Sequence, residues 1–531
     1  MNAEPLVRGD ATFATTAATA AGLIAGMIAR PAGRTSVSAY ETARLVSLAP
    51  WLTRHADRVR YLLATQRPDG GWGGPEGYAL VPTLSAVEGL LATVDRDAPV
   101  GWSVDGVRQA VDRALRLLHS GAGPAAYPVP DLPAVDLTVP ALAERIGERL
   151  TRPSVALDRW RGAGPPPLPA GMGRGRLDRV RRLAASGTAM PVKLLHALEA
   201  LGPAARQLAG VVPAPAGPVG ASPAATAAWL GGPDDRWPAA LDYLHGVVAD
   251  HDGQAPCAAP ITVFERSWVL SNLARARVPV EVPAALVAGL RDAVNPHGAA
   301  TGPGLPTDAD TTAVTLYALA RLGHRVGLAC LSRYDTGAHF CTWEGEDGAS
   351  VTTNAHVLEA FGWQLGHGEP NTATVVHRLT GWLLDQQQPG GAWTDRWHAS
   401  PYYATCCAVL ALHDHGGPRA RPAVRRAVDW VLATQRPDGG WGRWQETAEE
   451  TAYALHILLT AAADREAGPA VNRAVSRLSV LDDACPLWHD KDLYHPATIV
   501  HSAVVAARVL ADGRRRARPL TRTVPRSALL E

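Results

Sequence analysis

The sequence has little of several features that would point to common functional classes. Its 531 residues carry 51 basic and 50 acidic side chains, a formal net charge of +1. We therefore expect no nucleic-acid partner, since such partners favour a basic excess or patch. The six cysteines include no Cys-x-x-Cys pair, which argues against structural zinc and a disulfide framework and favours a reducing cytoplasm. No run approaches about 18 uninterrupted apolar residues, so we expect no stable membrane insertion.

Charged residues are also scarce, at 19%, whereas hydrophobic residues make up 47%. This composition can fill a large core, and the length exceeds that of one ordinary domain, so two domains are expected. The Ala-rich stretch Thr15–Ala29 is apolar enough to suggest a signal peptide. The acidic Glu4 and Asp10 before it dilute the positive flank that a signal peptide needs. We therefore interpret it as a packing helix.

One ten-residue segment occurs twice with almost the same sequence. Ala64–Gly73 (ATQRPDGGWG) recurs as Ala433–Gly442, and Asp385–Trp393 (DQQQPGGAW) is a weaker copy. Each copy follows an apolar helical pattern and ends in a Gly-rich turn with a tryptophan. We expect the glutamine to bond to nearby backbone and the tryptophan ring to pack against the next helix. Repeats of this kind tie successive helical hairpins into a ring.

The rest of the chain alternates apolar helical segments with short Gly/Pro turns. Examples are Val107–Leu118, Arg266–Ala274 and Thr353–Phe361. Alternating strand patterns are scarce, so the sequence predicts an all-α fold.

Two carboxylates stand two residues apart in Leu305–Val314 (LPTDADTTAV), at the start of an apolar helix. Acidic residues at a helix N-terminus are stabilised by the helix dipole. Taken alone, the pair is therefore interpreted as an N-cap carboxylate with a second carboxylate beside it. The chemical interpretation is a buried acid, Asp310, whose neighbour Asp308 orients its proton. Burial would keep such a pair singly protonated, because two adjacent anions repel in a low dielectric.

Together, the Gln–Gly–Trp repeats and the Asp-x-Asp motif resemble the class II terpene cyclases, the superfamily of squalene–hopene cyclases and copalyl diphosphate synthases. Other segments are similar to its bacterial diterpene-type members, namely Ser38–Ala43, Val263–Trp268, Asn354–Glu359, Trp397–Tyr403 and Lys491–Tyr494. The resemblance implies two (α/α) barrel domains, β and γ, with the active cavity between them. It divides the chain into an N-terminal helix at 1–35 that packs on β, a γ domain at 36–265 and a β domain at 266–531.

The resemblance also implies roles for residues around the motif. Asp310 becomes the acid and Asp308 its polarising partner. Thr311 stands where many members have a third aspartate, although Asp-x-Asp-Thr-Thr also occurs among resembling bacterial diphosphate synthases. Asn354 is similar to a family asparagine that contacts the acid, with a helix N-cap as the alternative. His356, or a water near it, is a candidate for the base that ends the reaction.

The implied activity is an isomerase reaction of the intramolecular lyase type. A proton added to the terminal double bond of a linear prenyl diphosphate closes a bicyclic labdane (copalyl-type) skeleton. Geranylgeranyl diphosphate is the favoured substrate. The alternatives are farnesyl diphosphate giving drimenyl diphosphate, a squalene–hopene-type triterpene cyclase, and a non-enzymatic α/α-toroid binding protein.

Aromatic faces can stabilise the migrating positive charge. The candidates for this role are Trp268, Trp343, Trp363, Trp397, Tyr402 and Tyr403, with core packing as the alternative for each. The basic residues in family-like segments, predicted to bind the diphosphate, are Lys193, Arg396 and Lys491.

Family members commonly use Mg²⁺, and Asp131 and Asp136 fall where its acidic ligands are expected, with a solvated loop as the alternative. The diphosphate should be retained, since Asp234-Asp235 lacks the third aspartate of the class I Asp-Asp-x-x-Asp motif. A downstream class I terpene synthase would then take the product, and a homodimer is a further possibility.

Overall fold

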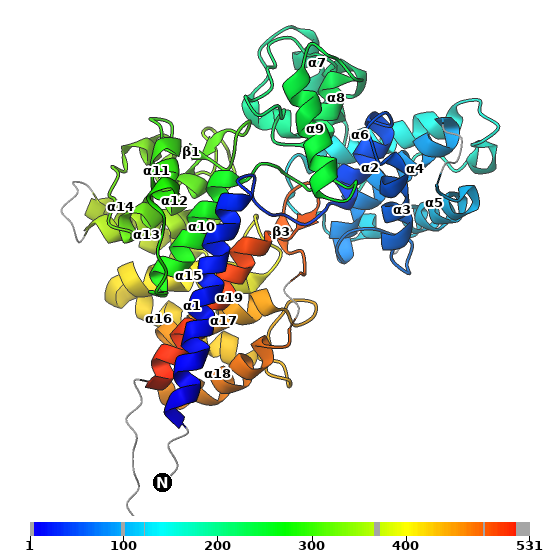
Figure 1. Ribbon diagram of the computed structural model, residues 1–531. Coiled ribbons are helices and arrows are strands. Elements are labelled where there is room, and N and C mark those ends of the chain that lie inside the picture. Colours follow the sequence, from blue (N-terminus) through cyan, green and yellow to red (C-terminus); the bar gives the residue numbers. More distant parts are fainter. Residues whose placement is uncertain (1–4, 97–100, 122, 366–371, 482–483, 517–531) are drawn as a thin grey trace, which may run out of the picture.

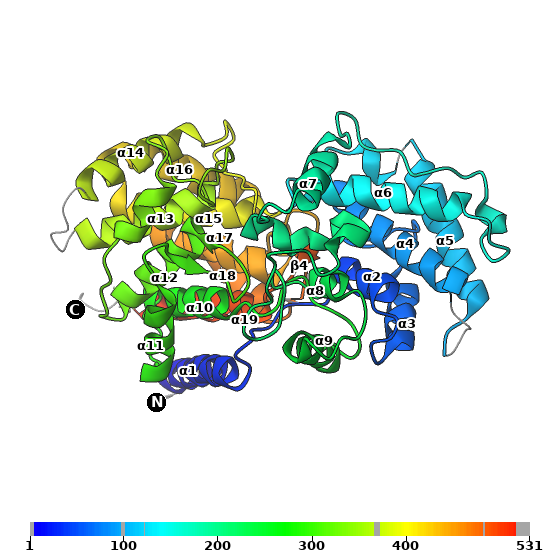
Figure 2. The same ribbon diagram turned by 90° about the horizontal axis from the view of Figure 1, so that it is seen from above.

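The computed structural model describes residues 5–96, 101–121, 123–365, 372–481 and 484–516. It has two helical lobes side by side (Figures 1 and 2). In each lobe an inner ring of helices is surrounded by outer helices, which is the arrangement of an α/α barrel. The predicted all-α fold of two α/α barrels is confirmed.

The larger lobe is the β domain. Within the described residues, six helices form its closed inner ring: α10 (Thr262–Arg275), α12 (Ala309–Arg321), α13 (Val351–Leu365), α15 (Pro401–His415), α17 (Ala448–Ala461) and α19 (Ala497–Arg516). Around them lie α11 (Ala284–Ala293), α14 (Thr372–Asp385), α16 (Gly417–Ala433), α18 (Asp464–Leu478) and the 3-10 turn η5 (Ala329–Tyr334). The N-terminal helix α1 (Pro5–Ala29) occupies the outer position between α19 and α10. Its Leu23, Ile24 and Met27 are buried in this lobe's core.

The smaller lobe is the γ domain. In the described part of the chain its ring consists of α2 (Ala39–Leu48), α4 (Leu80–Arg96), α6 (Val135–Thr151), the 3-10 segment η4 (Val192–Ala205) and α8 (Pro223–Leu230). Outside this ring lie α3 (His55–Thr65), α5 (Val104–His119), α7 (Gly175–Ala185) and α9 (Pro238–Asp250). Short 3-10 turns are η1 (Glu76–Ala79), η2 (Pro124–Ala126) and η3 (Asp158–Trp160).

The boundary between the domains lies a few residues before the predicted one. Helix α10 begins at Thr262, so a division after residue 265 falls inside it. Ile261 and Phe264 already belong to the buried core of the β domain. The helix therefore packs with the β domain along its whole length.

The glutamines of the repeats make the backbone contacts that the sequence predicts, whereas each tryptophan side chain bonds back to the preceding helix. In each copy the tryptophan Nε1–H donates to the carbonyl of the residue ten positions earlier at 2.8 Å: Trp72 to Leu62, Trp393 to Leu383 and Trp441 to Val431. The glutamine amide of each copy donates to its own Gly turn and to the following outer helix, as Gln66 does to Gly70 and Ala110 at 2.8 and 2.9 Å. Each repeat thus fastens a helix end to the next hairpin.

Two short hairpins interrupt the helices. Strands β1 (Ala299–Ala300) and β2 (Thr307–Asp308) pair antiparallel, with Ala299 opposite Asp308, directly before α12. Strands β3 (Trp488–His489) and β4 (Leu493–Tyr494) also pair antiparallel, and their tip, residues 490–492, reaches the γ domain. Both hairpins therefore lie where the two lobes meet.

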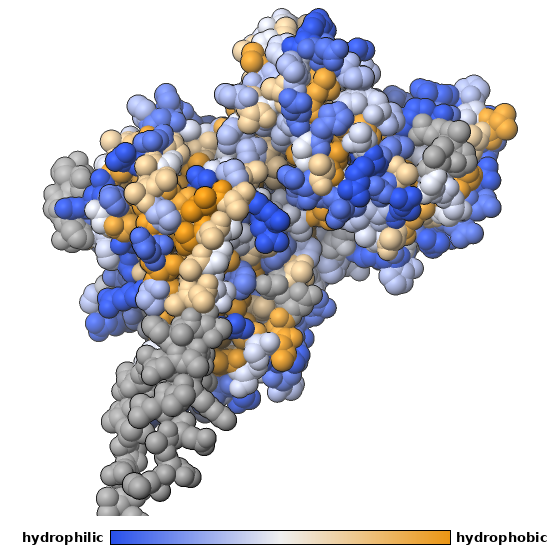
Figure 3. Space-filling model, in the orientation of Figure 1, coloured by the Kyte–Doolittle hydropathy of each residue, from blue (hydrophilic) through white to orange (hydrophobic). Residues whose placement is uncertain are grey.

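One described helical stretch, residues 76–96, is long and apolar enough to cross a membrane, but 94% of its apolar window is buried inside the protein. It contains α4, so its apolar character is explained by its place in the γ ring. On the face in Figure 3 the γ lobe is mainly hydrophilic, and apolar residues show chiefly on the β lobe beside α1 and α10.

Candidate functional site

A cavity lies between the two domains at the N-terminal end of α12. Its volume is about 170 Å³. Its γ-domain wall is formed by Pro133, Lys193 and His196. Its β-domain wall includes Phe264, Trp268, Trp343, Trp397, Trp488 and Tyr494, together with Asp308, Asp310 and Thr311.

Asp308 is both the N-cap of α12 and part of this wall. Its backbone is extended, and its Oδ1 accepts a 2.6 Å hydrogen bond from the Thr311 N–H. The N-cap interpretation is therefore confirmed. Burial raises the pKa of Asp308 to about 7, and the nearby charge of Asp310 acts in the same direction. At neutral pH this carboxyl carries a proton for a large part of the time.

Asp310 follows in the first turn of α12, with its side chain 15% exposed. Its Oδ1 lies 2.6 Å from Nδ1 of His356 on the neighbouring helix α13. Burial disfavours the charged form of that ring, but the Asp310 charge and hydrogen bond outweigh it, so the pKa of His356 is raised. Trp268 covers the imidazole edge-on at 5.4 Å. A carboxyl hydrogen-bonded to a basic ring thus borders an aromatic cavity.

Asn354 does not supply the hydrogen bond predicted for it. Its Oδ1 accepts from the Phe340 N–H at 2.8 Å, and its Nδ2 donates to the carbonyls of Phe340 and Ser350. Nor is it an N-cap, since it lies inside α13. The amide is used to hold the preceding loop against α13. The partner of Asp310 is instead His356, which the sequence had suggested only as a terminating base.

Thr311 keeps its place beside the acid. It lines the cavity, and its Oγ1 shares a 3.1 Å hydrogen bond with Oγ1 of Thr301. Its backbone N–H donates to Oδ1 of Asp308, the N-cap residue of α12. The residue that replaces a third aspartate therefore links the β1–β2 loop to the start of α12.

The predicted aromatic residues divide into two groups. Trp268, Trp343 and Trp397 line the cavity, and the last two pack edge-on at 5.1 Å. Trp363 and Tyr402 do not line it. Trp363 lies beneath the Arg321 guanidinium at 4.4 Å, and Tyr402 packs on Trp430 at 4.7 Å.

For Trp363 and Tyr402 the core-packing alternative is the right one. Tyr403, one position further along α15, faces inward instead, and its hydroxyl accepts a 2.9 Å hydrogen bond from Trp268 Nε1. Adjacent residues on a helix point about 100° apart. Tyr402 and Tyr403 therefore face different directions, and only Tyr403 points toward Trp268.

The three predicted basic residues have different surroundings. Lys193 lines the cavity on the γ side. Arg396 is paired with Glu346 and, at 3.0 Å, with Asp131, and it lies over the Trp397 ring at 5.0 Å. Lys491 has no exposed side-chain surface and is paired with Glu41 and Glu199. Its assignment as a diphosphate ligand is wrong, because its ammonium group is already surrounded by protein oxygens.

The acidic residues predicted for Mg²⁺ do not fit a metal site. Asp131 is paired with Arg396, and Asp136 is paired with Arg176 on α7. In the part of the chain that the structure describes, no three or more His, Cys, Asp or Glu side chains are grouped to hold a metal ion. The Asp131 side chain is 62% exposed, as the alternative of a solvated loop predicts. Magnesium remains a prediction, and no step below depends on it.

Sequence reasoning missed several residues of the cavity. Trp488, Asp490 and Tyr494 come from the β3–β4 hairpin, and His196 comes from η4. The segment Lys491–Tyr494 had been singled out, but its lysine was chosen over its neighbours. Lys491 and Tyr494, three positions apart, look equally suitable until the direction in which the hairpin points is known.

The comparisons with known proteins agree with this geometry. Residues 345–495 match the family model described as squalene-hopene cyclase C-terminal domain. The chain is 44% identical over 519 residues to an ent-copalyl diphosphate synthase of Streptomyces sp. (strain KO-3988), covering 96% of this chain and 99% of that protein. It is 42% identical over 524 residues to a labda-7,13-dienyl diphosphate synthase of Streptomyces clavuligerus, covering 93% and 92%. The solved structure of ent-copalyl diphosphate synthase from Streptomyces platensis matches with a TM-score of 0.88 at 40% identity, over 94% of this chain and 99% of that chain.

Proposed function

Since this chain belongs to the class II terpene cyclase family, in its bacterial copalyl diphosphate synthase-like group, we propose that it cyclises geranylgeranyl diphosphate to a bicyclic copalyl-type diphosphate. The reaction is an isomerisation started by protonation, and the diphosphate is retained. The observation that carries the proposal is the Asp310 carboxyl, hydrogen-bonded to His356 and bordering a cavity lined by tryptophans.

Asp310 acts as the acid. Its Oδ1 is bonded to His356, and the described residues offer no hydrogen-bond partner to Oδ2, which is left to protonate the terminal double bond. The Nδ1–H of His356 stabilises the carboxylate that remains after the proton has left. Asp308, with its pKa near 7, is partly neutral and so places less negative charge beside the departing proton.

The aromatic wall stabilises the cations that follow. Two alkenes attack in succession to close the bicycle, and each positive centre passes near π faces such as those of Trp268, Trp397 and Trp488. One such contact contributes about 0.5–2 kcal/mol. The cavity also excludes water, which would otherwise capture the cation. Because His356 is bonded to the acid, another basic group of the cavity takes the final proton.

The diphosphate end of the substrate lies toward the γ wall, where Lys193 supplies a positive charge. The product keeps an allylic diphosphate, so the chemistry that consumes it is ionisation by a separate class I terpene synthase. This order agrees with the lack of a complete Asp-Asp-x-x-Asp motif in the chain.

The test is an assay of the purified chain with geranylgeranyl diphosphate, farnesyl diphosphate and squalene in separate reactions with magnesium. The products are dephosphorylated and the alcohols identified by mass spectrometry and NMR. We expect a bicyclic C20 alcohol from geranylgeranyl diphosphate. Cyclisation of farnesyl diphosphate alone would instead assign a drimenyl diphosphate synthase, and squalene consumption a triterpene cyclase.

A further inference from the structure

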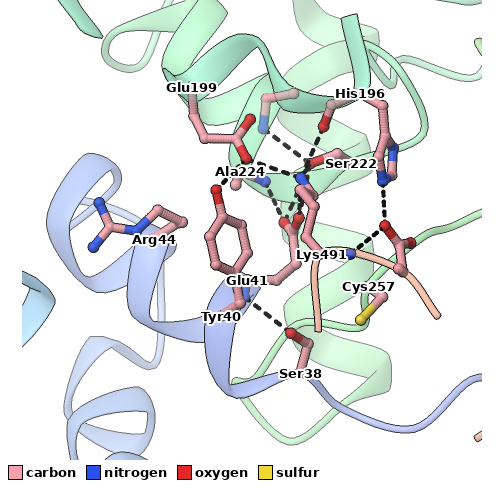
Figure 4. Close-up of polar contacts among 12 residues, drawn as sticks. Ser38, Tyr40, Glu41, Arg44, His196, Glu199, Ser222, Ala224, Cys257 and Lys491 are labelled. Carbon is pink, nitrogen blue, oxygen red and sulfur yellow. Dashed lines mark hydrogen bonds and ion pairs between the residues drawn. The ribbon is translucent and has the colours of Figure 1, made fainter. Parts of the chain in front are cut away.

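Lys491 lies at the tip of the β3–β4 hairpin yet makes its contacts in the other domain. Its Nζ is paired with Glu41 of α2 and lies 2.9 Å from Glu199 Oε1 of η4 (Figure 4). It also donates to Ser222 Oγ and to the His196 carbonyl, both at 2.8 Å. One lysine of the β domain therefore joins three elements of the γ ring.

The two neighbouring aspartates extend this contact. Asp492 Oδ2 accepts from Ser38 Oγ at 3.2 Å and from the backbone N–H groups of Ala39 and Tyr40. It thus binds the first turn of α2, where a negative charge is favoured by the helix dipole. Asp490 Oδ1 lies 2.7 Å from His196 Nε2. Residues 490–492 place three consecutive charged side chains into the γ domain.

This contact is directly connected to the substrate cavity. His196 and Asp490 both line it. The His196 ring is bonded through Nδ1 to the Gly220 carbonyl at 2.7 Å and through Nε2 to Asp490, while its own carbonyl accepts from Lys491. Its position is fixed on three sides, and two of these contacts come from the hairpin tip.

The contact is directional. A buried charge is costly unless it is paired, and Lys491 is surrounded by the carboxylates of Glu41 and Glu199 and by two neutral acceptors. Apolar packing would hold the two domains together over a range of positions, whereas three hydrogen bonds and an ion pair at one ammonium group define a single register.

We infer that Lys491 is a positioning residue that fixes the γ-domain wall of the cavity through residues 490–492 and so determines which cyclisation products form. This inference rests on the proposed function. Without Lys491 the wall around His196 loosens, the substrate folds in more than one way, and water enters. Water then adds to the bicyclic or monocyclic cation and loses one proton, giving a hydroxylated diphosphate in place of the alkene.

The variants Lys491→Met and Lys491→Arg test this inference, and Arg44→Met is the matched control. Arg44 is also a buried cation, paired with Glu88 at 2.6 Å with both side chains 1% exposed, but both partners lie within the γ domain. Product ratios, kcat and KM are measured well below each variant's unfolding temperature. For Lys491→Met we expect hydroxylated and monocyclic products to rise at least about tenfold, and kcat/KM to fall about 100-fold, as for a displaced substrate.

Lys491→Arg should restore most of the wild-type product ratio, because a guanidinium can reach the same oxygens. Arg44→Met should lower the unfolding temperature but leave the product ratio within about twofold. The inference is overturned if folded Lys491→Met gives the wild-type product ratio, or if Arg44→Met shifts the products equally.

Two further measurements cover the remaining outcomes. If Lys491→Met does not fold, Glu199→Gln takes its place, with the same shift expected at smaller size and an unchanged ratio overturning the inference. Hydrogen exchange of segment 192–205 needs no turnover: faster exchange in Lys491→Met than in Arg44→Met supports the positioning role, and equal exchange contradicts it. A wild-type protein that makes no cyclic product is a failure of the proposed function, and the exchange result stands separately from it.

Discussion

Two histidine–aspartate pairs face the same cavity from different sides. Asp310 and His356 lie 2.6 Å apart within the β domain, and Asp490 and His196 lie 2.7 Å apart across the domain interface. The residue types and distances are nearly the same. The surroundings differ at the histidine: among the described residues, Nε2 of His356 has no hydrogen-bond partner, whereas Oδ2 is without one in both aspartates. In the other pair, both ring nitrogens of His196 face oxygen acceptors, and Asp490 Oδ1 also accepts from the Lys491 N–H at 2.6 Å.

This difference decides what each pair can do. A histidine whose two nitrogens both face acceptors is stable as a cation, and the pKa of His196 is raised by Asp490 against the opposing effect of burial. Burial favours the neutral form of Asp490, but the His196 charge outweighs it and lowers the Asp490 pKa. That pair is a fixed ion pair. His356 has no such second acceptor among the described residues, so its contact with Asp310 is not held as a fixed ion pair and the acid can release a proton.

The largest expected effect comes from removing the proton itself. Asp310→Asn keeps the shape of the side chain but cannot donate, so turnover should fall at least about 1,000-fold. The measurement is the rate of bicyclic product formation, with thermal stabilisation by substrate as the check on binding. Asp490→Asn is the comparison, and we expect no more than about a tenfold loss. Equal losses from the two variants would mean that the two pairs do not differ as described.

A smaller effect is expected from the histidine of the reactive pair. His356→Gln retains a hydrogen-bond donor but loses the charge, so kcat should fall about 100-fold with KM little changed. His456, another buried histidine of the β barrel, bonded to the Ala503 carbonyl at 3.0 Å, provides the control. His456→Gln should leave kcat within about threefold. An unchanged kcat in His356→Gln would show that Asp310 needs no basic partner.

The aromatic wall should contribute less per residue. Trp268→Leu removes a π face next to the reactive pair and should lower kcat about tenfold, corresponding to roughly 1.4 kcal/mol. Trp363→Leu removes an aromatic ring of the same barrel that lies outside the cavity. Its kcat should change less than about threefold at a temperature where it is folded. The comparison fails if Trp363→Leu slows the folded enzyme as much as Trp268→Leu.

The smallest expected effect concerns stability rather than rate. The Asp308 pKa is raised by burial from 3.8 to about 7, so the folded protein holds a proton that the unfolded chain releases between these values. This contribution is fully present below pH 4 and is lost as pH rises through 7, by about 1 kcal/mol per pH unit. In Asp308→Asn it is absent, so the free energy of unfolding should fall less steeply between pH 5 and 7 than in the wild type. Parallel slopes would place the titration elsewhere.

Local features of the site could be predicted because their causes are local. The Asp308 cap depends on a neighbour three residues away, and the Trp72 and Gln66 contacts form within one turn and the next hairpin. The partner of Asp310 could not be predicted in this way. Asn354 and His356 lie two residues apart on α13, and only the packing of α13 against α12 decides which of them reaches the acid.

The sequence by itself determined the helical repeats and the Asp308/Asp310 pair at the start of a helix, since these follow from spacing along the chain, whereas the two-barrel architecture and the role of Asp310 came from the family resemblance. Only the tertiary structure decided that Lys491 holds Glu41 and Glu199 rather than a diphosphate. These partners lie 450 and 292 positions away in the chain. No local pattern shows whether a lysine will face solvent, substrate or buried carboxylates, because burial depends on which distant surfaces meet.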